Sequence, residues 1–327
     1  MRLALEEAWR YQLLTYPNPA VGATVISACG KILAVEAHKK AGAPHAEVNA
    51  LKAAYIRLTN DDAIKPLQSA AEIHAYLKKH HNGCFVGCEI YTTLEPCAHD
   101  GKTPSCASLI AELGVQKVYI GARDTNETAA GGGVMLQNNG ITVEYDISKE
   151  ACEALLLPFY RYLSGRFIFF KWAQRLDGST NDGTISSQSS RETVHKMRDV
   201  CDLLVIGGNT VRTDRPTLDA RLIGGKAPDV LLYSHQKEFD TTIPLFGVAD
   251  REVIISDSLE PIKNYSCIMI EGGEALFRLT RGIVDCYAAF IAPRMQKSEG
   301  FRSVEADFTI LHSQKIGEDI LLWMQGK

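Results

Sequence analysis

The 327-residue sequence lacks several features that would place it in whole classes of protein. It has no apolar run of the roughly 20 residues that a membrane-spanning helix needs. Its formal net charge is −4, and the absence of a basic excess disfavours extended binding to nucleic acid. It has no secretory signal peptide, and its nine cysteines are scattered and odd in number, which does not suggest a disulfide framework. We therefore expect a cytoplasmic protein with no membrane partner and no nucleic-acid partner.

The sequence also lacks the glycine fingerprint of the common dinucleotide-binding fold. The glycines from Gly131 to Gly133 are more typical of a turn that leads into a helix. The length of the chain predicts two domains, and a hydrophobic content of 46% is sufficient for two cores. Since no such fingerprint identifies a cofactor site, the evidence for function comes from groups of metal-binding and acid–base residues that are close in the sequence.

Such a group surrounds a predicted strand at Ile90 to Thr93. The strand is followed by Pro96 and Cys97, and a second cysteine, Cys106, is expected to open a helix. Further upstream, His45 and Glu47 stand two residues apart. The arrangement approximates the zinc deaminase pattern, in which H-x-E precedes a Pro-Cys pair and a later cysteine.

This set of residues suits hydrolysis at a metal ion. We expect His45, Cys97 and Cys106 to bind Zn²⁺, which leaves a fourth position for water. Zinc lowers the pKa of that water toward about 7, and Glu47 would carry protons from the water to the leaving amine. The alternative is a buried histidine with two inert core cysteines. The four residues together favour the zinc site.

The segment between the two cysteines is longer than in the commoner Cys-x-x-Cys arrangement. Eight residues separate Cys97 from Cys106, and they include His99, Lys102 and Thr103. These side chains supply a cation and hydrogen-bond donors beside the predicted metal. We expect them to bind an anionic group of the substrate, such as a phosphate.

The first half of the chain alternates strands and helices, which predicts an α/β/α sandwich. The helices are predicted at 3–14, 45–58, 69–79 and 147–165, and the strands at 20–26, 32–37, 90–93, 115–121 and 141–145.

These motifs resemble those of the bifunctional deaminase–reductases of riboflavin biosynthesis. The resemblance is carried by His45-Ala46-Glu47, by the run from Pro96 to Cys106, and by Tyr16 to Gly22, which is similar to a substrate loop of that family. It implies that Asn18 contacts the substrate. It also implies a cytidine-deaminase-like sandwich followed by a dihydrofolate-reductase-like α/β domain. Because that family usually passes directly from a helix to a strand where residues 59–87 stand, the resemblance implies that this segment is an insertion with a helix of its own.

The second half resembles the reductase of the same family at Phe167 to Gly178, Gly207 to Val211 and Glu271 to Gly273. The glycines before the last helix would let backbone amides approach a pyrophosphate. The resemblance implies that NADPH is bound by Ala173, Thr210, Asp214, Ser234, Gly273, Glu274, Ala275, Leu276, Phe277, Arg278 and Leu279. It assigns Arg198, Leu218, Arg221 and Glu271 to the substrate, with the two arginines as a phosphate clamp.

Two departures from the family weaken the second half of the match. Thr184 stands where the family has a tryptophan, and residues 294–297 replace a glycine pair. A chain with deaminase activity alone, whose reductase-like half is not catalytic, is therefore the alternative.

The predicted organisation is a zinc-dependent deaminase at 1–147, a linker helix at 148–165 and an NADPH-dependent reductase at 166–327. The resemblance implies a small-molecule substrate, the phosphorylated pyrimidine diaminohydroxyphosphoribosylaminopyrimidine, and a homo-oligomer is expected. Two other classes remain open at this point: a deaminase that edits nucleic-acid bases, and a metal-stabilised scaffold without activity.

Overall fold

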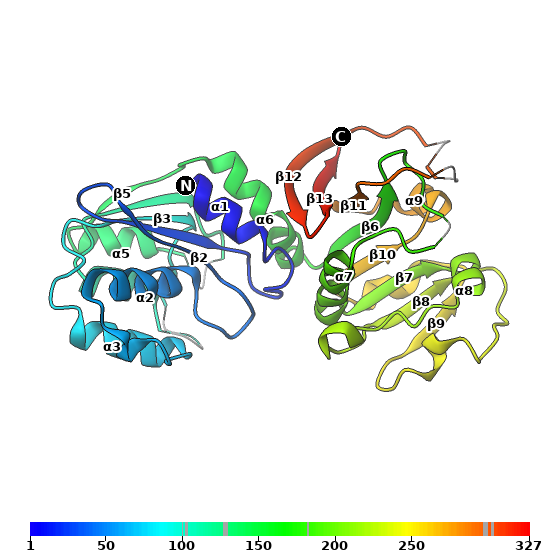
Figure 1. Ribbon diagram of the computed structural model, residues 1–327, viewed down its shortest axis with the longest axis horizontal. Coiled ribbons are helices and arrows are strands. Elements are labelled where there is room, and N and C mark those ends of the chain that lie inside the picture. The colour runs from blue at the N-terminus through cyan, green and yellow to red at the C-terminus, as the bar shows by residue number, and fades with distance from the viewer. Residues whose placement is uncertain (100, 102–103, 127–129, 182, 297–299, 302–303) are drawn as a thin grey trace. The chain divides into compact units, whose positions relative to one another are not determined.

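Figure 1 presents the computed structural model, which describes residues 1–99, 101, 104–126, 130–181, 183–296, 300–301 and 304–327. The chain divides into two compact units, Met1–Leu157 and Pro158–Lys327. The division falls inside helix α6 (Lys149–Leu163). The fold class expected from the sequence is confirmed, since both units are layered α/β domains built on one sheet each.

The sheet of the first unit has the strand order β2-β1-β3-β4-β5. Its first two strands are antiparallel to their neighbours, whereas β3, β4 and β5 run parallel. The strands are β1 (Gly22–Ile26), β2 (Ile32–Ala37), β3 (Glu89–Leu94), β4 (Lys117–Ala122) and β5 (Thr142–Glu144). The carboxyl end of β3 therefore delivers Cys97 to one edge of the sheet.

Helices cover this sheet on both faces, with α1 and α6 on one side and α2 on the other (Figure 1). Close packing fixes the first layer, because a side chain at Gly22 would overlap the backbone of Ala4, and one at Gly121 would overlap the thiol of Cys152. The helices are α1 (Arg2–Trp9), α2 (Ala46–Thr59), α3 (Ala70–His80), α4 (Cys106–Glu112), α5 (Gly132–Asn138) and α6.

The first helix is shorter than the sequence predicts. We expected a helix over 3–14, but α1 ends at Trp9 and turns follow to Pro17. Leu13 adopts a left-handed backbone conformation with φ of 70°, which a continuing right-handed helix cannot contain.

The segment 59–87 forms a short 3-10 turn and helix α3, close to the predicted range of 69–79. Ser69 and Glu72 cap this helix reciprocally. The hydroxyls of Tyr55 and Tyr76 both donate to Asp61 Oδ2, at 2.9 and 2.6 Å, and tie the segment to α2. It is therefore a packed part of the first unit.

The second unit is organised around an eight-stranded sheet with the order β12-β13-β11-β6-β10-β7-β8-β9. The strands from β11 to β9 in this order are parallel, and the carboxy-terminal hairpin β12–β13 is antiparallel. They are β6 (Phe167–Arg175), β7 (Leu203–Gly207), β8 (Asp229–Tyr233), β9 (Val253–Ser256), β10 (Cys267–Glu271), β11 (Cys286–Ala292), β12 (Phe308–Ile316) and β13 (Asp319–Gly326).

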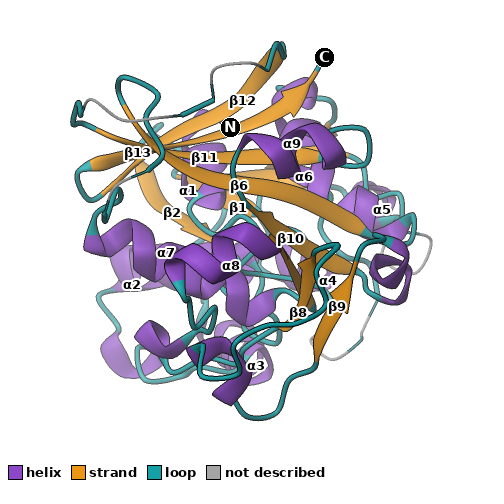
Figure 2. Cartoon of the chain, turned by 90° about the vertical axis from the view of Figure 1, so that its right-hand side faces the viewer, coloured by secondary structure: helices purple, strands orange, loops and turns teal. Residues whose placement is uncertain are grey.

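Two apolar clusters lie on the two faces of this sheet. One contains Phe170, Phe277 and Tyr287, and the other contains Ile206 and Val211. Helices α7 (Gln188–Val200), α8 (Gly208–Asp214) and α9 (Glu274–Thr280) connect the parallel strands (Figure 2). The carboxyl ends of β7, β8 and β10 meet at one edge, which is where open parallel sheets bind ligands.

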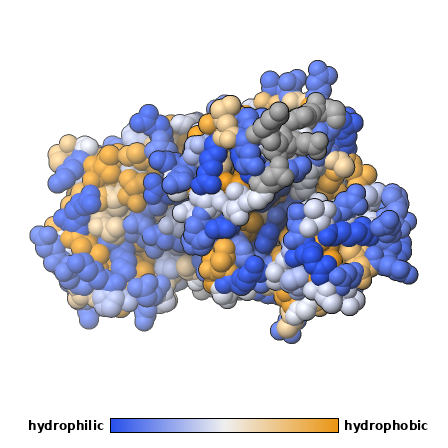
Figure 3. Space-filling view, turned by 45° about the vertical axis from the view of Figure 1, so that its right-hand side comes forward, coloured by the Kyte–Doolittle hydropathy of each residue, from blue (hydrophilic) through white to orange (hydrophobic). Residues whose placement is uncertain are grey.

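The surface mixes polar and apolar side chains. On the face drawn in Figure 3, hydrophilic and hydrophobic residues are interspersed. Large exposed apolar side chains include Val86, Met295 and Ile310, and single residues of this kind are common on folded proteins. None of the helices that the structure describes is both long and apolar enough to cross a lipid bilayer.

Candidate functional site

The three predicted metal ligands lie together in the first unit. His45, Cys97 and Cys106 offer ligand atoms that all lie within 4.8 Å of one another, and they are the one such cluster of histidine, cysteine and carboxylate groups among the described residues. His45 Nδ1 lies 3.4 Å from Cys106 Sγ and 3.7 Å from Cys97 Sγ. The two sulfurs and this nitrogen therefore form a compact triangle.

The triangle has the dimensions of a tetrahedral zinc site. Bond lengths of about 2.3 Å to sulfur and about 2.0 Å to nitrogen, at tetrahedral angles, place sulfur and nitrogen about 3.5 Å apart. The two measured separations, 3.4 and 3.7 Å, bracket this value. One imidazole and two thiols are also a donor set that zinc prefers. The residues fit a zinc ion with three protein ligands.

The local sequence explains how each ligand is positioned. His45 is the residue before α2, with an extended backbone (φ −66°, ψ 164°), so its ring leaves the helix end. Ser105 caps α4 by accepting from the amide of Ser108, and its hydroxyl donates to the carbonyl of Cys97. The amide of Cys106 donates to Cys97 Sγ at 3.3 Å. The start of α4 thus folds around Cys97.

The two thiols differ in acidity. The hydrogen bond from Cys106 lowers the pKa of Cys97 to about 4, against the opposing effect of burial and with help from His45. The pKa of the Cys106 thiol lies well above its ordinary value, because it hydrogen-bonds to Cys97 and is buried. Burial opposes a charged ring at His45, but Cys97 and Glu47 raise its pKa. The site therefore holds one ready thiolate and one thiol that must lose its proton when a metal binds.

Glu47 lies beside this cluster. It belongs to the first turn of α2, is buried, and interacts with Cys106. Burial raises its pKa to about 7, despite the opposing effects of His45 and of the hydrogen bond with Cys106. A carboxyl group with this pKa can both accept and release a proton near neutral pH, as a proton carrier must.

Asn18, predicted to contact the substrate, is connected to the metal cluster by His38. The side-chain amide of Asn18 lies 3.1 Å from His38 Nε2, and His38 Nδ1 lies 3.1 Å from the carbonyl of Pro44. The His38 ring meets the His45 ring edge-on, with 5.4 Å between centroids. Burial lowers the pKa of His38 to about 4, so it is neutral: Nδ1 donates to Pro44 and Nε2 accepts from Asn18. The sequence alone does not indicate this role of His38.

Glu95, which the sequence does not indicate as a site residue, supports the segment that leads to Cys97. Its two carboxylate oxygens accept from the amides of Gly133, at 2.9 Å, and Asp124, at 3.2 Å. A side chain at Gly132 would overlap the carbonyl of Pro96. The glycine run, which the sequence indicated only as a turn, is needed here for close approach to the cysteine loop.

Only one of the three predicted phosphate contacts lies within the described residues. His99 is exposed on the loop between the two cysteines. Lys102 and Thr103 lie outside the described residues.

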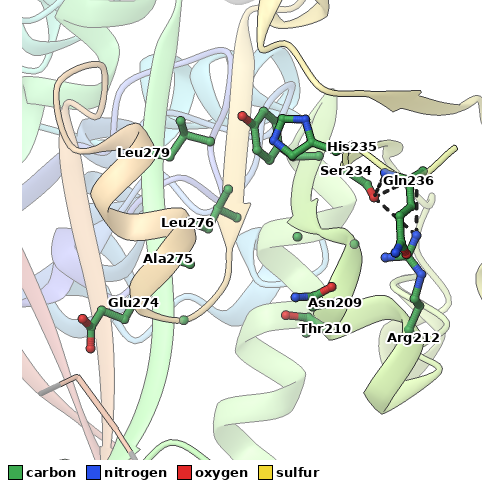
Figure 4. Close-up of a pocket in the computed structure, with 14 residues that line it drawn as sticks. Asn209, Thr210, Arg212, Ser234, His235, Gln236, Glu274, Ala275, Leu276 and Leu279 are labelled. Atoms are coloured by element: carbon green, nitrogen blue, oxygen red, sulfur yellow. Dashed lines mark hydrogen bonds between the residues drawn. The ribbon is translucent and has the colours of Figure 1, made fainter. Parts of the chain in front are cut away.

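The second unit contains a cavity of about 650 Å³ at the carboxyl edge of its sheet (Figure 4). The size is typical of a cofactor site. Segments after β7, after β8 and after β10 surround it. They contribute Gly207, Gly208, Asn209, Thr210, Arg212, Tyr233, Ser234, His235, Gln236, Gly273, Glu274, Ala275, Leu276 and Leu279.

Most of the predicted NADPH residues line this cavity, namely Thr210, Ser234, Gly273, Glu274, Ala275, Leu276 and Leu279. Four others lie outside its wall. Phe277 packs edge-on against Phe170 in the core, at 5.4 Å between ring centroids. Arg278 forms an ion pair with Glu274 at 2.7 Å, Asp214 is exposed at the end of α8, and Ala173 lies on β6.

The glycines of the cavity test whether a dinucleotide can fit. A Cβ at Gly273 would meet no atom within 4 Å and would enter the cavity, whereas one at Gly208 would press on Ser234 and Arg212. The bare backbone at Gly273 is thus a cradle that a side chain would fill. The residues fit a phosphate-bearing cofactor that approaches the backbone closely.

The predicted substrate residues form a separate charged group. Arg198 donates to both carboxylate oxygens of Glu271, and Lys171 Nζ lies 3.5 Å from the same carboxylate. Burial opposes the negative charge, but Arg198 and Lys171 hold the pKa of Glu271 at about 2. Burial also lowers the pKa of Lys171.

Leu218 and Arg221 flank Asp219 in the same region. Arg221 pairs with the Asp219 carboxylate at 2.8 Å, and Arg198 donates to the Asp219 carbonyl at 3.3 Å. Leu218 is buried with φ of 57°. Both arginines predicted as a phosphate clamp therefore lie near one another, although each already has a carboxylate partner.

Sequence reasoning missed the cavity residues Arg212, Tyr233, His235 and Gln236. Strand β8 was not recognised, and its end supplies three of them. The apolar run from Val230 to Leu232 before Ser234 was the available signal.

Comparisons with known proteins agree with this division into two sites. Residues 1–122 match the family model described as the cytidine and deoxycytidylate deaminase zinc-binding region. Residues 166–322 match the RibD C-terminal domain. The first match contains all three residues of the metal cluster, and the second contains the whole cavity.

Similarity to curated proteins extends along the chain. The riboflavin biosynthesis protein RibD of Aquifex aeolicus is 28% identical in an alignment of 373 positions, gaps included. The alignment covers 99% of this chain and 97% of that protein. RibD of Bacillus amyloliquefaciens is 31% identical over 269 residues, which cover 80% of this chain and 63% of that protein.

Solved structures share the architecture. A diaminohydroxyphosphoribosylaminopyrimidine deaminase/5-amino-6-(5-phosphoribosylamino)uracil reductase from Thermotoga maritima has a TM-score of 0.66 and 25% identity, and the match covers 100% of this chain and 97% of that one. RibD from Acinetobacter baumannii has a TM-score of 0.64 at 24% identity, with the same coverage, and supports the fold alone.

Proposed function

The chain belongs to the family of bifunctional deaminase–reductases of riboflavin biosynthesis, and we propose that each half carries out one of the family's two reactions. The first half hydrolyses the amino group of diaminohydroxyphosphoribosylaminopyrimidine and releases ammonia. The second half reduces the ribosyl side chain of that product to a ribityl chain with NADPH. We assign the deaminase to residues 1–147, the linker helix to 148–165 and the reductase to 166–327.

For the deaminase, we propose His45, Cys97 and Cys106 as the zinc ligands. Zinc, when bound there, supplies the Lewis acidity that makes a water molecule nucleophilic at neutral pH. Glu47 takes a proton from the attacking water and delivers it to the departing amine. The amino group thus leaves the pyrimidine ring as ammonia, and the oxygen atom of water takes its place. No redox partner is needed. The buried position of Glu47, with its pKa near 7, supports this role.

We propose that two groups of residues bind the substrate. Asn18 presents an amide that the neutral His38 holds in place, which suits recognition of a polar ring edge. We assign His99, Lys102 and Thr103 to the phosphate of the substrate, because a long loop with donors and a cation suits a dianion.

For the reductase, NADPH, when bound, would supply the hydride that adds to the open-chain carbonyl or imine carbon of the sugar, and a proton from solvent would complete the reduction at the oxygen or nitrogen. We propose that the cofactor occupies the cavity at the ends of β7, β8 and β10. The substrate would bind next to the cofactor. There it would contact the charged group of Arg198 and Glu271, together with Leu218 and Arg221. Ala173, Asp214, Phe277 and Arg278 remain part of the proposed cofactor set and act from beside the cavity wall.

The observation that carries the deaminase assignment is the triangle of one nitrogen and two sulfurs with a buried carboxyl group beside it. A coupled assay tests the whole proposal. The purified chain receives the pyrimidine substrate and NADPH, and the release of ammonia and the consumption of NADPH are followed together. We expect ammonia to be released first and NADPH to be consumed only when deamination proceeds.

The alternative of a deaminase with a non-catalytic second half finds no support in the cavity or in the match to the RibD C-terminal domain. Binding of NADPH, followed by fluorescence, tests it directly. Ammonia release without any binding of NADPH at millimolar concentration would leave a deaminase alone.

Two further features complete the proposal. We propose a cytoplasmic location, which agrees with nine cysteines that are all free in the structure. We also propose a homo-oligomer, which sedimentation or size-exclusion mass measurements would test.

A further inference from the structure

One arginine in the cavity of the second unit is placed differently from the others nearby. Arg212 lies on α8 and lines the cavity, and its guanidinium group faces Ser234 and Gln236 (Figure 4). Its Nη2 donates to Ser234 Oγ at 3.3 Å and to the carbonyls of Gln236 and Glu238, both at 3.4 Å. All three bonds are long and use the same nitrogen. Among the described residues, no hydrogen bond is found for the remaining donors of this group, Nε and Nη1.

Arg212 has no carboxylate partner among the described residues, in contrast to the arginines around it. Arg198 pairs with Glu271, Arg215 with Asp240, and Arg278 with Glu274. The guanidinium carbon of Arg212 lies 4.1 Å from the ring centroid of Phe239, which holds the group in one orientation. A fixed cation in a cavity that lacks its anion is suited to an anionic ligand.

The order of strands indicates which part of NADPH reaches this cation. Glu271, assigned to the substrate, ends β10, and β7 and then β8 follow in the sheet. A dinucleotide whose nicotinamide meets the substrate near β10 must extend across β7 and place its adenosine half at the end of β8. Ser234, His235 and Gln236 stand at that end, and none of the three carries a negative charge that would repel a phosphate.

From this placement, we propose that Arg212 binds the 2′-phosphate of NADPH and makes the second domain select NADPH over NADH. The inference rests on the proposed reductase function. Arg212 presents its free donors to the phosphate oxygens. The hydroxyl of Ser234 donates to the carbonyl of Gln236 and accepts from the Gln236 amide, which holds this loop in place beside the arginine. The carboxylate of Glu274 lies on the opposite wall and is neutralised by Arg278, so it does not repel the dianion.

The test is a set of equilibrium binding measurements on the full chain. Dissociation constants for NADPH and NADH are measured by calorimetry or fluorescence, and those for 2′,5′-ADP and 5′-AMP isolate the adenosine end. We expect Arg212→Gln to weaken NADPH and 2′,5′-ADP roughly 10- to 100-fold, the value of a charge-assisted hydrogen bond. Its affinities for NADH and 5′-AMP should stay unchanged.

Two more variants control for folding and for loss of charge. Arg212→Lys keeps the charge without the planar fork and should retain part of the preference for NADPH. Arg215→Gln removes a neighbouring exposed arginine that pairs with Asp240 outside the cavity, and should bind NADPH as the unmodified chain does. If Arg212→Gln does not fold, an unchanged NADPH-to-NADH preference in Arg212→Lys overturns the proposal.

The outcomes separate this inference from the reductase assignment. Equal weakening of NADPH and NADH in Arg212→Gln would place the arginine at the pyrophosphate and overturn the inference alone. An unchanged preference for NADPH in that variant would do the same. Failure of the unmodified chain to bind either cofactor would overturn both the inference and the proposed reductase function.

Discussion

Arg198 and Glu271 form a two-bond ion pair in the second unit. Nε and Nη2 of the arginine donate to the two carboxylate oxygens, at 2.8 and 3.1 Å, and both side chains are only 12% exposed. Lys171 joins them from β6, where it lies directly opposite Glu271 in the parallel register. The pair therefore fixes the region where we place the substrate, and the arginine is not free before a ligand arrives.

Replacing Glu271 with glutamine should destabilise the second domain by about 3–5 kcal/mol, because Arg198 and Lys171 are left buried without their counter-charge. Unfolding in urea, followed by the fluorescence of Trp172 and Trp323, measures the change. Glu318→Gln is the control, since Glu318 is exposed and pairs weakly with Arg294 at 3.6 Å. The control should change stability by less than about 1 kcal/mol. Equal effects of the two variants would contradict the role of the buried pair.

The same carboxylate predicts a pH dependence. The pKa of Glu271 is about 2 in the folded protein, below its usual value of 4.5. Its contribution to stability is therefore complete above pH 4.5 and is lost as the pH falls from 4.5 toward 2. The free energy of unfolding of the second domain should decrease over this range, and less steeply in Glu271→Gln. Identical pH profiles for the two proteins would show that Glu271 is not the group responsible.

Arg251 supports the loop that carries Leu218. It donates to the carbonyls of Thr217 and Leu218, both at 2.8 Å, and also to the carbonyl of Leu245. Arg251→Met preserves much of the volume but leaves three carbonyl groups without this donor, and should cost about 2–4 kcal/mol of unfolding free energy. Arg215→Met, an exposed arginine, should cost less than about 1 kcal/mol. Denaturant unfolding of both variants measures these costs. Equal losses of unfolding free energy in the two variants would contradict the supporting role of Arg251.

Gly273→Ala should weaken NADPH binding without affecting stability, because the new methyl group enters the cavity and meets no protein atom. We expect an increase in the dissociation constant of about tenfold or more, equivalent to about 1.4 kcal/mol. Gly247→Ala is a matched control: its methyl group is equally unobstructed, and Gly247 does not line the cavity. Fluorescence titration with NADPH and thermal melting of both variants provide the comparison. Unaltered NADPH affinity in Gly273→Ala would place the cofactor elsewhere.

The sequence predicted the metal cluster because its chemistry is carried by a few residue types at short spacings. His45 and Glu47 open one helix, and Cys97 and Cys106 bracket one loop, so two local patterns were sufficient. The support given by Glu95 and His38 was not predictable in this way. Glu95 acts through backbone amides that are distant in the sequence, such as that of Gly133, and His38 acts through the side chain of Asn18, with which it shares no local pattern.

The cofactor cavity was predicted less completely, for a topological reason. Part of its wall is formed by residues at the ends of β7 and β8, which lie side by side in the sheet. Strand β8 was not recognised from the sequence. The sequence also does not distinguish the exposed face of α9 from its buried face, and Phe277, a member of the proposed cofactor set, packs in the core. The early end of α1 was equally unpredictable, since leucine rarely adopts the left-handed conformation that the buried Leu13 has here.

The most direct test of the account is single-turnover deamination by zinc-loaded Glu47→Gln. We predict that this variant retains one zinc ion per chain, because the three ligands are intact. Its rate of ammonia release should fall at least about 100-fold, the usual contribution of a positioned acid–base group. A near-normal rate with zinc retained would contradict the proposed role of Glu47 and the mechanism built on it.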